Sequence, residues 1–327
     1  MPIISIILPV CNGEKTIRET IESILKQTFS DFELIVINDG SKDSTVEIVS
    51  SFPDPRIKLF SYPNAGQPAS RNRGISRAEG EYISFIDADD LWTPDKLEAQ
   101  FKALQNNPQA AVAYSWTNMI DESGKFLREG AYLSYEGDVL TELLLSNFLE
   151  NGSNPLIRAS ALREVGNFDE SLSNAHDWDM WLRLAARYHF VAVSSIQILY
   201  RVSSTSMSSN VLGMQKSSLR VIERAYAQAP ESIQHFKRIS LANSHKYLIF
   251  KALEGFPNPK KGLAAAWFLW YAVRNDPVLL RRRIFWKVLF NIALVVSLPP
   301  QMAKNLLSKM HKIGNLNTLF TSIQTHP

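Results

Sequence analysis

The strongest constraint on the fold is a repeated alternation of short apolar runs with helical patterns in about the first 120 residues. Most positions in each run are apolar, rather than every second one. The runs lie at Ser5–Val10, Glu33–Ile37, Ile57–Phe60, Tyr82–Ile86 and Ala111–Trp116. Strands of this kind are covered on both faces, and strands connected through helices usually run parallel. The sequence therefore predicts an α/β fold with a mostly parallel sheet and helices on both of its faces.

The chain changes character after residue 212. Residues 1–212 contain 18 Lys and Arg against 28 Asp and Glu, a net charge of −10, whereas residues 213–327 contain 17 against 4, a net charge of +13. The apolar pattern also becomes helical, with helices expected at Met214–Ala229, Ile233–Leu253 and Gly262–Val273. The sequence therefore predicts an acidic α/β domain at residues 1–212, followed by a helical, basic C-terminal region at residues 213–327.

The single cysteine and the N-terminus both bear on the cellular compartment. Cys11 cannot form an intrachain disulfide, which favours a reducing compartment, and we interpret it as a small packing residue. The N-terminal sequence MPIISIILPV lacks the basic segment of a secretory signal and continues directly into the first predicted strand. We therefore expect a cytoplasmic protein.

A cluster of carboxylates follows the fourth predicted strand. Asp87 and Asp89 lie at positions i and i+2 of the sequence Asp87-Ala88-Asp89-Asp90, where both side chains can converge on one cation. Mn²⁺ and Mg²⁺ prefer oxygen ligands and usually share their coordination shell with a substrate diphosphate. The alternative is an acidic turn in which Asp89 or Asp90 caps the next helix. The position at the carboxyl edge of a parallel sheet, where such sheets bind ligands, favours the metal site.

Two further aspartates lie where a ligand could be bound. Asp39 follows the second predicted strand and could accept a hydrogen bond from a nucleobase N–H, or it could be a turn residue ahead of Gly40. Asp177 lies in the first turn of a helix whose buried face is marked by Trp181 and Leu184. It is either a capping residue that the helix dipole stabilises or a general base that takes a proton from an incoming hydroxyl. Spacing alone does not decide between these two roles.

Six segments of the chain, taken together, resemble the family 2 nucleotide-sugar glycosyltransferases. They occur in the family's order and spacing over roughly residues 3–206, and they are Ser5–Glu14, Glu33–Thr45, Asn64–Gly74, Gly80–Trp92, Val165–Glu170 and His176–Leu184. The resemblance implies the A-type glycosyltransferase fold, a nucleotide diphosphate-sugar donor and inversion at the anomeric carbon. It also implies a catalytic domain at residues 1–212 that transfers sugar to an acceptor hydroxyl, in surface polysaccharide, glycolipid or glycoprotein synthesis.

Matching the family's motifs residue by residue then implies roles for individual side chains. The residues that would bind the nucleotide-sugar are Pro9, Val10, Asn12, Glu14, Asp39, Arg71, Asp87 and Ala88. Among them, Asp39 would meet the base, Arg71 would stand near the nucleotide or its phosphates, and Asp87 would bind through the ribose or the metal. Asp89 would be the main ligand of a divalent cation cofactor, Mn²⁺ or Mg²⁺. Asp177 would be the catalytic base.

The chain departs from the family's pattern at two positions. His176 precedes Asp177 where the family usually has a glutamate, so the family's contacts with the acceptor are not transferred to this position. Ser203 ends the sequence Tyr200-Arg-Val-Ser203 where many relatives have a histidine. A role for that histidine in the metal or diphosphate shell is therefore not transferred either.

Two other functions remain open from the sequence. A nucleotidyltransferase also uses metal-binding aspartates on an α/β sheet, but it usually needs a glycine-rich, basic triphosphate loop, and Cys11–Thr16 offers only Lys15. The second is a catalytically inactive nucleotide-sugar-binding protein, and the retention of Asp89 and Asp177 argues against it. We expect a nucleotide diphosphate-sugar donor and a saccharide, lipid-linked or protein acceptor as partners, and no nucleic acid.

The C-terminal region carries a candidate membrane surface between about Gly262 and Lys312. Its apolar stretch Ile284–Leu298 is shorter than the ~20 residues that a spanning helix needs. The region also contains basic and interfacial aromatic residues: Arg281, Arg282, Arg283, Lys304, Lys309, Lys312, Trp267, Trp270, Tyr271 and Trp286. One polar stripe is predicted on the apolar helix, formed by Arg283, Lys287 and Asn291. We expect peripheral contact with anionic lipid on the inner face of the membrane. Packing on the acidic domain and a dimer interface are the alternatives.

Overall fold

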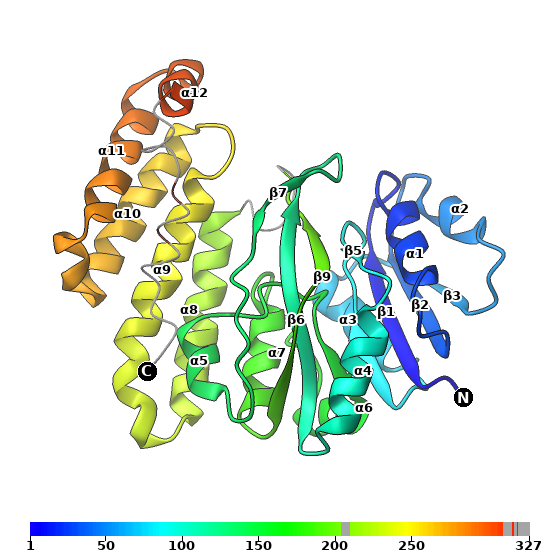
Figure 1. Cartoon of the computed structure of the whole chain (residues 1–327). Helices are drawn as coiled ribbons and strands as arrows, with labels where there is room; N and C mark the ends of the chain where they lie inside the picture. Colours follow the sequence, from blue (N-terminus) through cyan, green and yellow to red (C-terminus); the bar gives the residue numbers. More distant parts are fainter. Residues whose placement is uncertain (204–209, 310–315, 317–318, 320–327) are drawn as a thin grey trace. The chain divides into compact units, whose positions relative to one another are not determined.

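The computed structural model describes residues 1–203 and 210–309, together with Leu316 and Leu319 (Figure 1). Contacts within the chain divide it into two compact units. The first unit consists of residues 1–140 and 147–203, and the second consists of residues 141–146 and 204–327. Each unit has a hydrophobic core of its own.

The first unit is built on a nine-stranded sheet in the order β3-β2-β1-β4-β8-β6-β9-β5, with β7 beside β6. The strands are β1 (Ile4–Val10), β2 (Phe32–Asp39), β3 (Ile57–Tyr62), β4 (Tyr82–Phe85), β5 (Leu91–Trp92), β6 (Ala110–Ile120), β7 (Phe126–Glu129), β8 (Leu156–Arg158) and β9 (His189–Arg201). Strands β3, β2, β1 and β4 are parallel neighbours, as are β6 and β9, whereas the short β8 lies antiparallel between β4 and β6. The predicted α/β fold is confirmed, and strands β5, β7, β8 and β9 were not predicted.

Helices cover both faces of this sheet because both faces of β1 are apolar. One face packs against helix α1 (Ile17–Leu25) in a core cluster that includes Ile4, Ile6 and Leu8. On the other face, Ile7 lies against helix α3 (Gln67–Ile75) at Gly74, where a Cβ atom would be only 2.3 Å from Ile7 Cγ2. Glycine therefore permits the close packing of α3 on β1. The remaining helices of this unit are α2 (Thr45–Ser50), α4 (Lys96–Asn106), α6 (Ala159–Val165) and α7 (His176–Ala185).

The register of the parallel strands brings their carboxyl ends to one edge of the sheet. Val10 at the end of β1 pairs with Asn38 near the end of β2, and β2 and β3 end together. The backbone N–H of Ile86, just past β4, donates to the carbonyl of Ile7 at 3.0 Å. The loops that follow these strands therefore lie along one edge, which is where parallel sheets bind their ligands.

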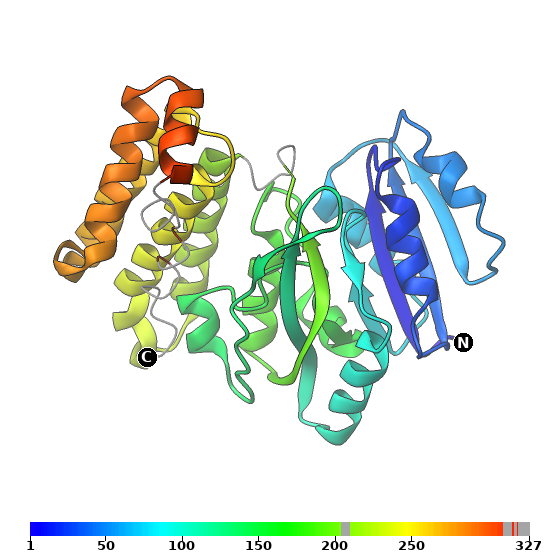
Figure 2. The same ribbon diagram turned by 45° about the horizontal axis from the view of Figure 1, so that its top comes forward.

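The second unit is helical, which confirms the predicted helical C-terminal region. Its helices lie side by side in both views, coloured from yellow-green to orange-red (Figure 1 and Figure 2). They are α8 (Val211–Gln228), α9 (Lys237–Leu253), α10 (Pro259–Asn275), α11 (Arg283–Ser297) and α12 (Pro300–Lys309), with 3-10 turns at Glu231–Phe236 and Pro277–Arg281. Most of the short helix α5 (Leu140–Leu145) belongs to this unit as well, and the side chain of Asn243 donates to the carbonyl of Leu145 at 3.0 Å.

The predicted polar stripe on α11 is present only in part. Asn291 is buried, and its side-chain amide donates to the carbonyl of Lys287 at 2.8 Å, so the prediction is wrong at this position. Arg283 is exposed, and the large apolar side chains exposed on α11 are Trp286, Leu289 and Phe290. Lys312 lies outside the described residues. Among the helices of the described chain, none combines the length and the apolar character needed to cross a membrane.

Candidate active site

The loops that follow β1 and β2 are joined by hydrogen bonds. The backbone N–H of Asn12 donates to the Ser41 hydroxyl at 2.9 Å, and the Asn12 side-chain oxygen accepts the N–H of Lys42 at 2.8 Å. Glu14 accepts the N–H of Ser44 at 3.2 Å. Asn12 has a φ of 55°, a conformation that costs free energy in residues other than glycine and is enriched at functional sites. The two loops therefore form one preshaped rim in which Asn12 and Glu14 are exposed.

Asp39 organises the loop that leads into α3. Its carboxylate accepts the backbone N–H of Ala65 at 2.9 Å and of Gly66 at 2.8 Å, and Arg73 donates to it at 3.0 Å. Asp39 itself is only 3% exposed. A carboxylate has about four lone-pair sites, so these three bonds leave limited capacity for a ligand. In this structure Asp39 fixes the start of the helix that also carries Arg71.

Arg71 forms a buried ion pair with Asp87. Its guanidinium Nη2 lies 2.7 Å from Asp87 Oδ1, and the same carboxylate oxygen accepts from the Gln67 side chain at 2.5 Å. Arg71 is 1% exposed, and a Cβ atom on Gly152 would be 2.2 Å from its Nη2. The Ser153 hydroxyl accepts the backbone N–H of Asp87 at 2.9 Å. The anion nearest to Arg71 in the structure is therefore the Asp87 carboxylate, which it orients.

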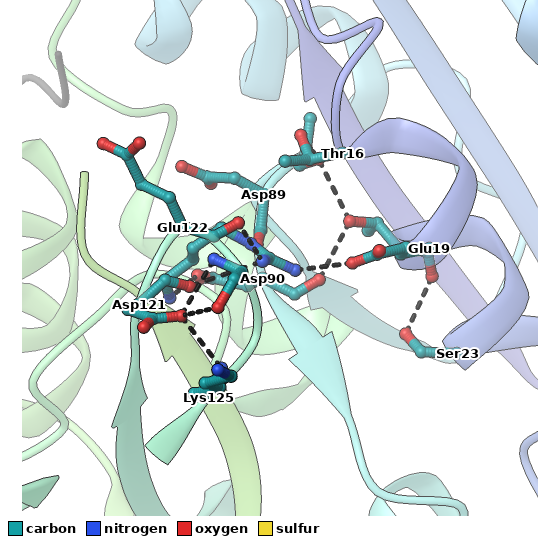
Figure 3. A network of polar contacts seen from close by, with 12 residues as sticks. Thr16, Glu19, Ser23, Asp89, Asp90, Asp121, Glu122 and Lys125 are labelled. Carbon is teal, nitrogen blue, oxygen red and sulfur yellow. Dashed lines mark hydrogen bonds and ion pairs between the residues drawn. The ribbon is translucent and has the colours of Figure 1, made fainter. Parts of the chain in front are cut away.

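Arg201, at the end of β9, donates hydrogen bonds to the other two residues of the aspartate cluster, Asp89 and Asp90. Its Nε donates to the carbonyl of Asp89 at 2.8 Å, and its backbone N–H donates to the carboxylate of Asp90 at 2.9 Å. The guanidinium also forms a 2.8 Å ion pair with Glu19 and donates to the carbonyl of Glu122 at 3.0 Å. Figure 3 shows these acidic partners gathered in one network. Arg201 is not among the predicted site residues, although an arginine at the end of an apolar strand segment could have indicated a site residue.

The carboxylate of Asp89 differs from its neighbours because it points out of this network (Figure 3). Within the described chain, the hydrogen bond assigned to this carboxylate comes from its own backbone N–H. Burial raises the pKa of Asp89 to about 6, and the negative charge of Asp87 adds to the effect. Burial, followed by the charges of Asp89 and Asp87, also raises the pKa of Asp90 well above its ordinary value. Burial and the repulsion between carboxylates therefore both oppose the ionisation of Asp89 and Asp90, and a cation bound here would favour their charged forms.

The carboxylates of Asp87 and Asp89 fit a divalent cation that takes most of its other ligands from the substrate phosphates and from water. No group of three or more His, Cys, Asp or Glu side chains that could hold a metal occurs among the described residues. Mg²⁺ and similar cations are commonly bound by one or two carboxylates, with substrate phosphates and water completing the shell. Asp89 and Asp87 supply that number of hard oxygen ligands.

Asp177 lies in the first turn of α7, next to the same cluster. It follows Ala175, which has a φ of 55°, and one oxygen of its carboxylate accepts the N–H of Trp178 at 2.8 Å. Burial raises the pKa of Asp177, the charge of Arg71 opposes this shift, and the charge of Asp87 adds to it. Asp177 is therefore within electrostatic range of both Arg71 and Asp87.

The neighbours of Asp177 have different environments. Asp179 forms an ion pair with Arg183 at 3.0 Å and is 4% exposed at its side chain. His176 is buried against Phe168, and its two ring nitrogens have no hydrogen-bond partner among the described residues. Burial, together with the positive charge of Arg71, lowers the pKa of His176 well below its ordinary value, so this histidine is neutral at pH 7.

The other residues predicted to bind the nucleotide-sugar, Pro9, Val10 and Ala88, lie in β1 or in the loop after β4. Pro9 and Val10 are buried in β1, so their side chains do not line the edge. The carbonyl of Ala88 accepts hydrogen bonds from the hydroxyls of Thr16 at 2.8 Å and Thr20 at 3.0 Å, which ties the aspartate cluster to α1.

Cys11 is exposed on the loop after β1, so its interpretation as a packing residue is wrong.

The sequence is similar to those of known glycosyltransferases. The sequence model of the family described as "Glycosyltransferase like family 2" matches residues 5–252. An uncharacterized glycosyltransferase of Rickettsia bellii is 38% identical over 189 residues, which are 56% of this chain and 27% of the relative. The hyaluronan synthase of Pasteurella multocida is 28% identical over 259 residues, which are 78% of this chain and 26% of the synthase. The chain thus spans about a quarter of the length of these curated relatives.

The fold has a counterpart among solved structures. A mannosyltransferase from Pyrobaculum calidifontis, solved in complex with GDP-Man and Mn²⁺, superposes with a TM-score of 0.59 at 18% sequence identity. The match covers 98% of this chain and 83% of that enzyme. At this identity the likeness concerns the fold alone. Because the family's sequence model covers well over half of the chain, the protein belongs to the glycosyltransferase-like family 2.

Proposed function

We propose that this protein is an inverting glycosyltransferase that moves a sugar from a nucleotide diphosphate-sugar to an acceptor hydroxyl. The observation that carries the proposal is the crowding of Asp87, Asp89 and Asp177 at one edge of the sheet, beside two loops that are already joined. Such a site is suited to a ligand that brings a cation and a diphosphate. The similarity to the hyaluronan synthase of Pasteurella multocida favours a role for this transfer in polysaccharide synthesis.

The donor would lie along the rim formed by the loops after β1, β2 and β4. The exposed side chains of Asn12 and Glu14 and the main chain of Pro9, Val10 and Ala88 would contact the nucleotide. Asp39 would use its remaining lone pairs on the base, while it continues to hold the start of α3. Arg71 would act through Asp87, which it orients, more than through the phosphates themselves.

A divalent cation is proposed as the cofactor, with Asp89 as its main protein ligand and Asp87 as the second. The Mn²⁺ bound in the Pyrobaculum calidifontis mannosyltransferase supports this choice. When bound, such a cation would offset the charge of the leaving diphosphate, a contribution worth several kcal/mol in metalloenzymes.

Asp177 is proposed as the general base. Its carboxylate would take the proton of the acceptor hydroxyl as the hydroxyl oxygen forms a bond to the anomeric carbon and the bond from that carbon to the diphosphate oxygen breaks. Attack from the side opposite the diphosphate inverts the anomeric configuration. The raised pKa of Asp177 makes it a stronger base than an exposed aspartate.

We further propose that residues 1–212 form the catalytic domain and that residues 213–327 rest on the inner face of a membrane. The exposed aromatic residues Trp267, Trp270 and Trp286, which are 50–62% exposed, suit the lipid interface. Basic residues of the same helical unit would contact anionic headgroups.

The first prediction concerns the cation. Calorimetry should show UDP or GDP binding at least about tenfold more tightly with Mn²⁺ than without it, and Asp89→Ala should abolish that gain. Asp31→Ala removes an exposed carboxylate at the opposite end of β2 and should keep the full gain. An equal metal dependence in the Asp89→Ala protein would refute the assignment.

The second prediction concerns the base. Asp177→Asn keeps size and polarity but cannot accept the proton, so turnover should fall by about 10²–10⁴-fold. Turnover would be measured as nucleoside diphosphate released from a panel of nucleotide sugars with Mn²⁺. Affinity for the nucleotide and the melting temperature should stay close to wild type. Wild-type turnover in this variant would place the base elsewhere.

The third prediction concerns the membrane. The full chain should float with liposomes that contain anionic lipid, and it should float less at high salt because headgroup attraction is screened. Replacing Arg281, Arg282 and Arg283 with glutamate in the full chain should abolish flotation. If the wild-type chain stays at the bottom at low salt, the helical unit is a packing or dimerisation element and the membrane proposal is wrong.

A further inference from the structure

A pair of stacked aromatic rings lies beside the proposed active site and has no part in the mechanism above. Trp116, on β6, and Tyr132, in the segment after β7, have ring centroids 5.0 Å apart and planes inclined by 22°. Both side chains are partly exposed. We call these two residues the ring pair.

The ring pair is held at its polar ends. The indole N–H of Trp116 donates to the Ser134 hydroxyl at 3.1 Å, and the Tyr132 hydroxyl donates to the side-chain oxygen of Asn118. Asn118 lies two residues after Trp116 on the same strand and therefore on the same face of the sheet. The rings are thus fixed in place while apolar ring surface remains open to solvent.

The carboxylate of Glu150 flanks the ring pair. Glu150 accepts the backbone N–H of Ala131 at 3.1 Å, and a Cβ atom on Gly130 would be 2.3 Å from its Oε2. The charges of Glu129 and Glu150 act on the Tyr132 phenol and help to raise its pKa, after burial, the largest cause. Glu150 and Tyr132 have φ values of 67° and 46°, and strain at such positions is concentrated at ligand sites. A rigid ring surface bordered by hydrogen-bond acceptors results.

The segment Glu150–Ser153 connects the ring pair to the proposed donor site. The Asn151 side chain donates to the Thr117 hydroxyl at 3.0 Å on β6. The Ser153 hydroxyl accepts the N–H of Asp87 at 2.9 Å and donates to Asp90 at 2.5 Å. Three residues span at most about 11 Å, so the main chain of Glu150 lies within the reach of a short saccharide from the aspartate cluster.

We propose that Trp116, Tyr132 and Glu150 bind a pyranose ring of the acceptor, which makes the acceptor a saccharide. A pyranose has an apolar C–H face that can lie on an aromatic ring and a rim of hydroxyls that donate to carboxylate and amide oxygens. The ring pair offers the first kind of contact, and Glu150 and Asn118 offer the second. This inference rests on the proposed function, since it names the acceptor of that same reaction.

The test uses the full chain and methyl glycosides of glucose, galactose, mannose and N-acetylglucosamine as probes. Saturation-transfer NMR at millimolar concentration should show contact with the ring C–H protons of at least one glycoside. Sorbitol, a linear polyol, should show none. Trp116→Leu and Tyr132→Leu keep apolar bulk but remove a ring, so each should abolish the signal. Phe126→Leu, at an exposed position of the neighbouring strand β7, is the matched control and should retain it.

Binding of UDP or GDP with Mn²⁺ to the same proteins separates the two proposals. Normal nucleotide binding with no glycoside signal in the wild type, or with an equal signal in both leucine variants, would overturn the acceptor subsite alone. Loss of nucleotide binding in every protein, together with a ring-dependent glycoside signal, would overturn the proposed function and leave a saccharide site. Binding of choline in place of the glycosides would also overturn the subsite, because it would identify the ring pair as a cation site.

Discussion

The arrangement of the site depends on one electrostatic constraint, the confinement of like-charged carboxylates at the edge of the sheet. Asp87, Asp89 and Asp90 lie within four residues of sequence. Asp87 raises the free energy of ionising Asp89, and both raise that of Asp90. Two buried arginines from distant parts of the chain offset this cost without removing it. Arg71 pairs with Asp87 at 2.7 Å, and Arg201 donates to the backbone and side chains around Asp89 and Asp90. A divalent cation would be attracted by these carboxylates and would in turn offset the negative charge of a diphosphate.

The fold around this cluster serves to hold it in place. Parallel strands end at one edge, so the loops after β1, β2 and β4 meet there. Helix α3 joins two parts of the site, because its start is fixed by Asp39 and its buried face carries Arg71. The segment 150–153 extends the same network to β6 through Asn151 and to Asp87 through Ser153. Hydrogen bonds of the segment 150–153 thus connect the aspartate cluster to β6 within the first unit.

Local sequence patterns predicted those parts of the fold that local physics determines. Continuous apolar runs identified β1 to β4 and β6 because strands buried on both faces need apolar residues throughout, and the strand ends placed Asp39 and Asp87 to Asp90. Local patterns could not predict contacts between residues that are far apart in the sequence. The Arg201–Asp89 contact joins residues 112 positions apart, and the antiparallel β8 is only three residues long. The burial of Asn291 and the exposure of Cys11 were mispredicted for the same reason, since packing partners decide which face is covered.

The proposed function depends on the binding of a nucleotide diphosphate to the aspartate cluster through a divalent cation. Crystals grown with Mn²⁺ and UDP or GDP would test it directly through an anomalous difference map at the manganese edge. We predict a manganese peak within ordinary coordination distance of the Asp89 carboxylate and next to the diphosphate, with the nucleobase beside Asp39. A nucleotide bound elsewhere, or one bound in this site while manganese stays away from Asp87 and Asp89, would contradict it.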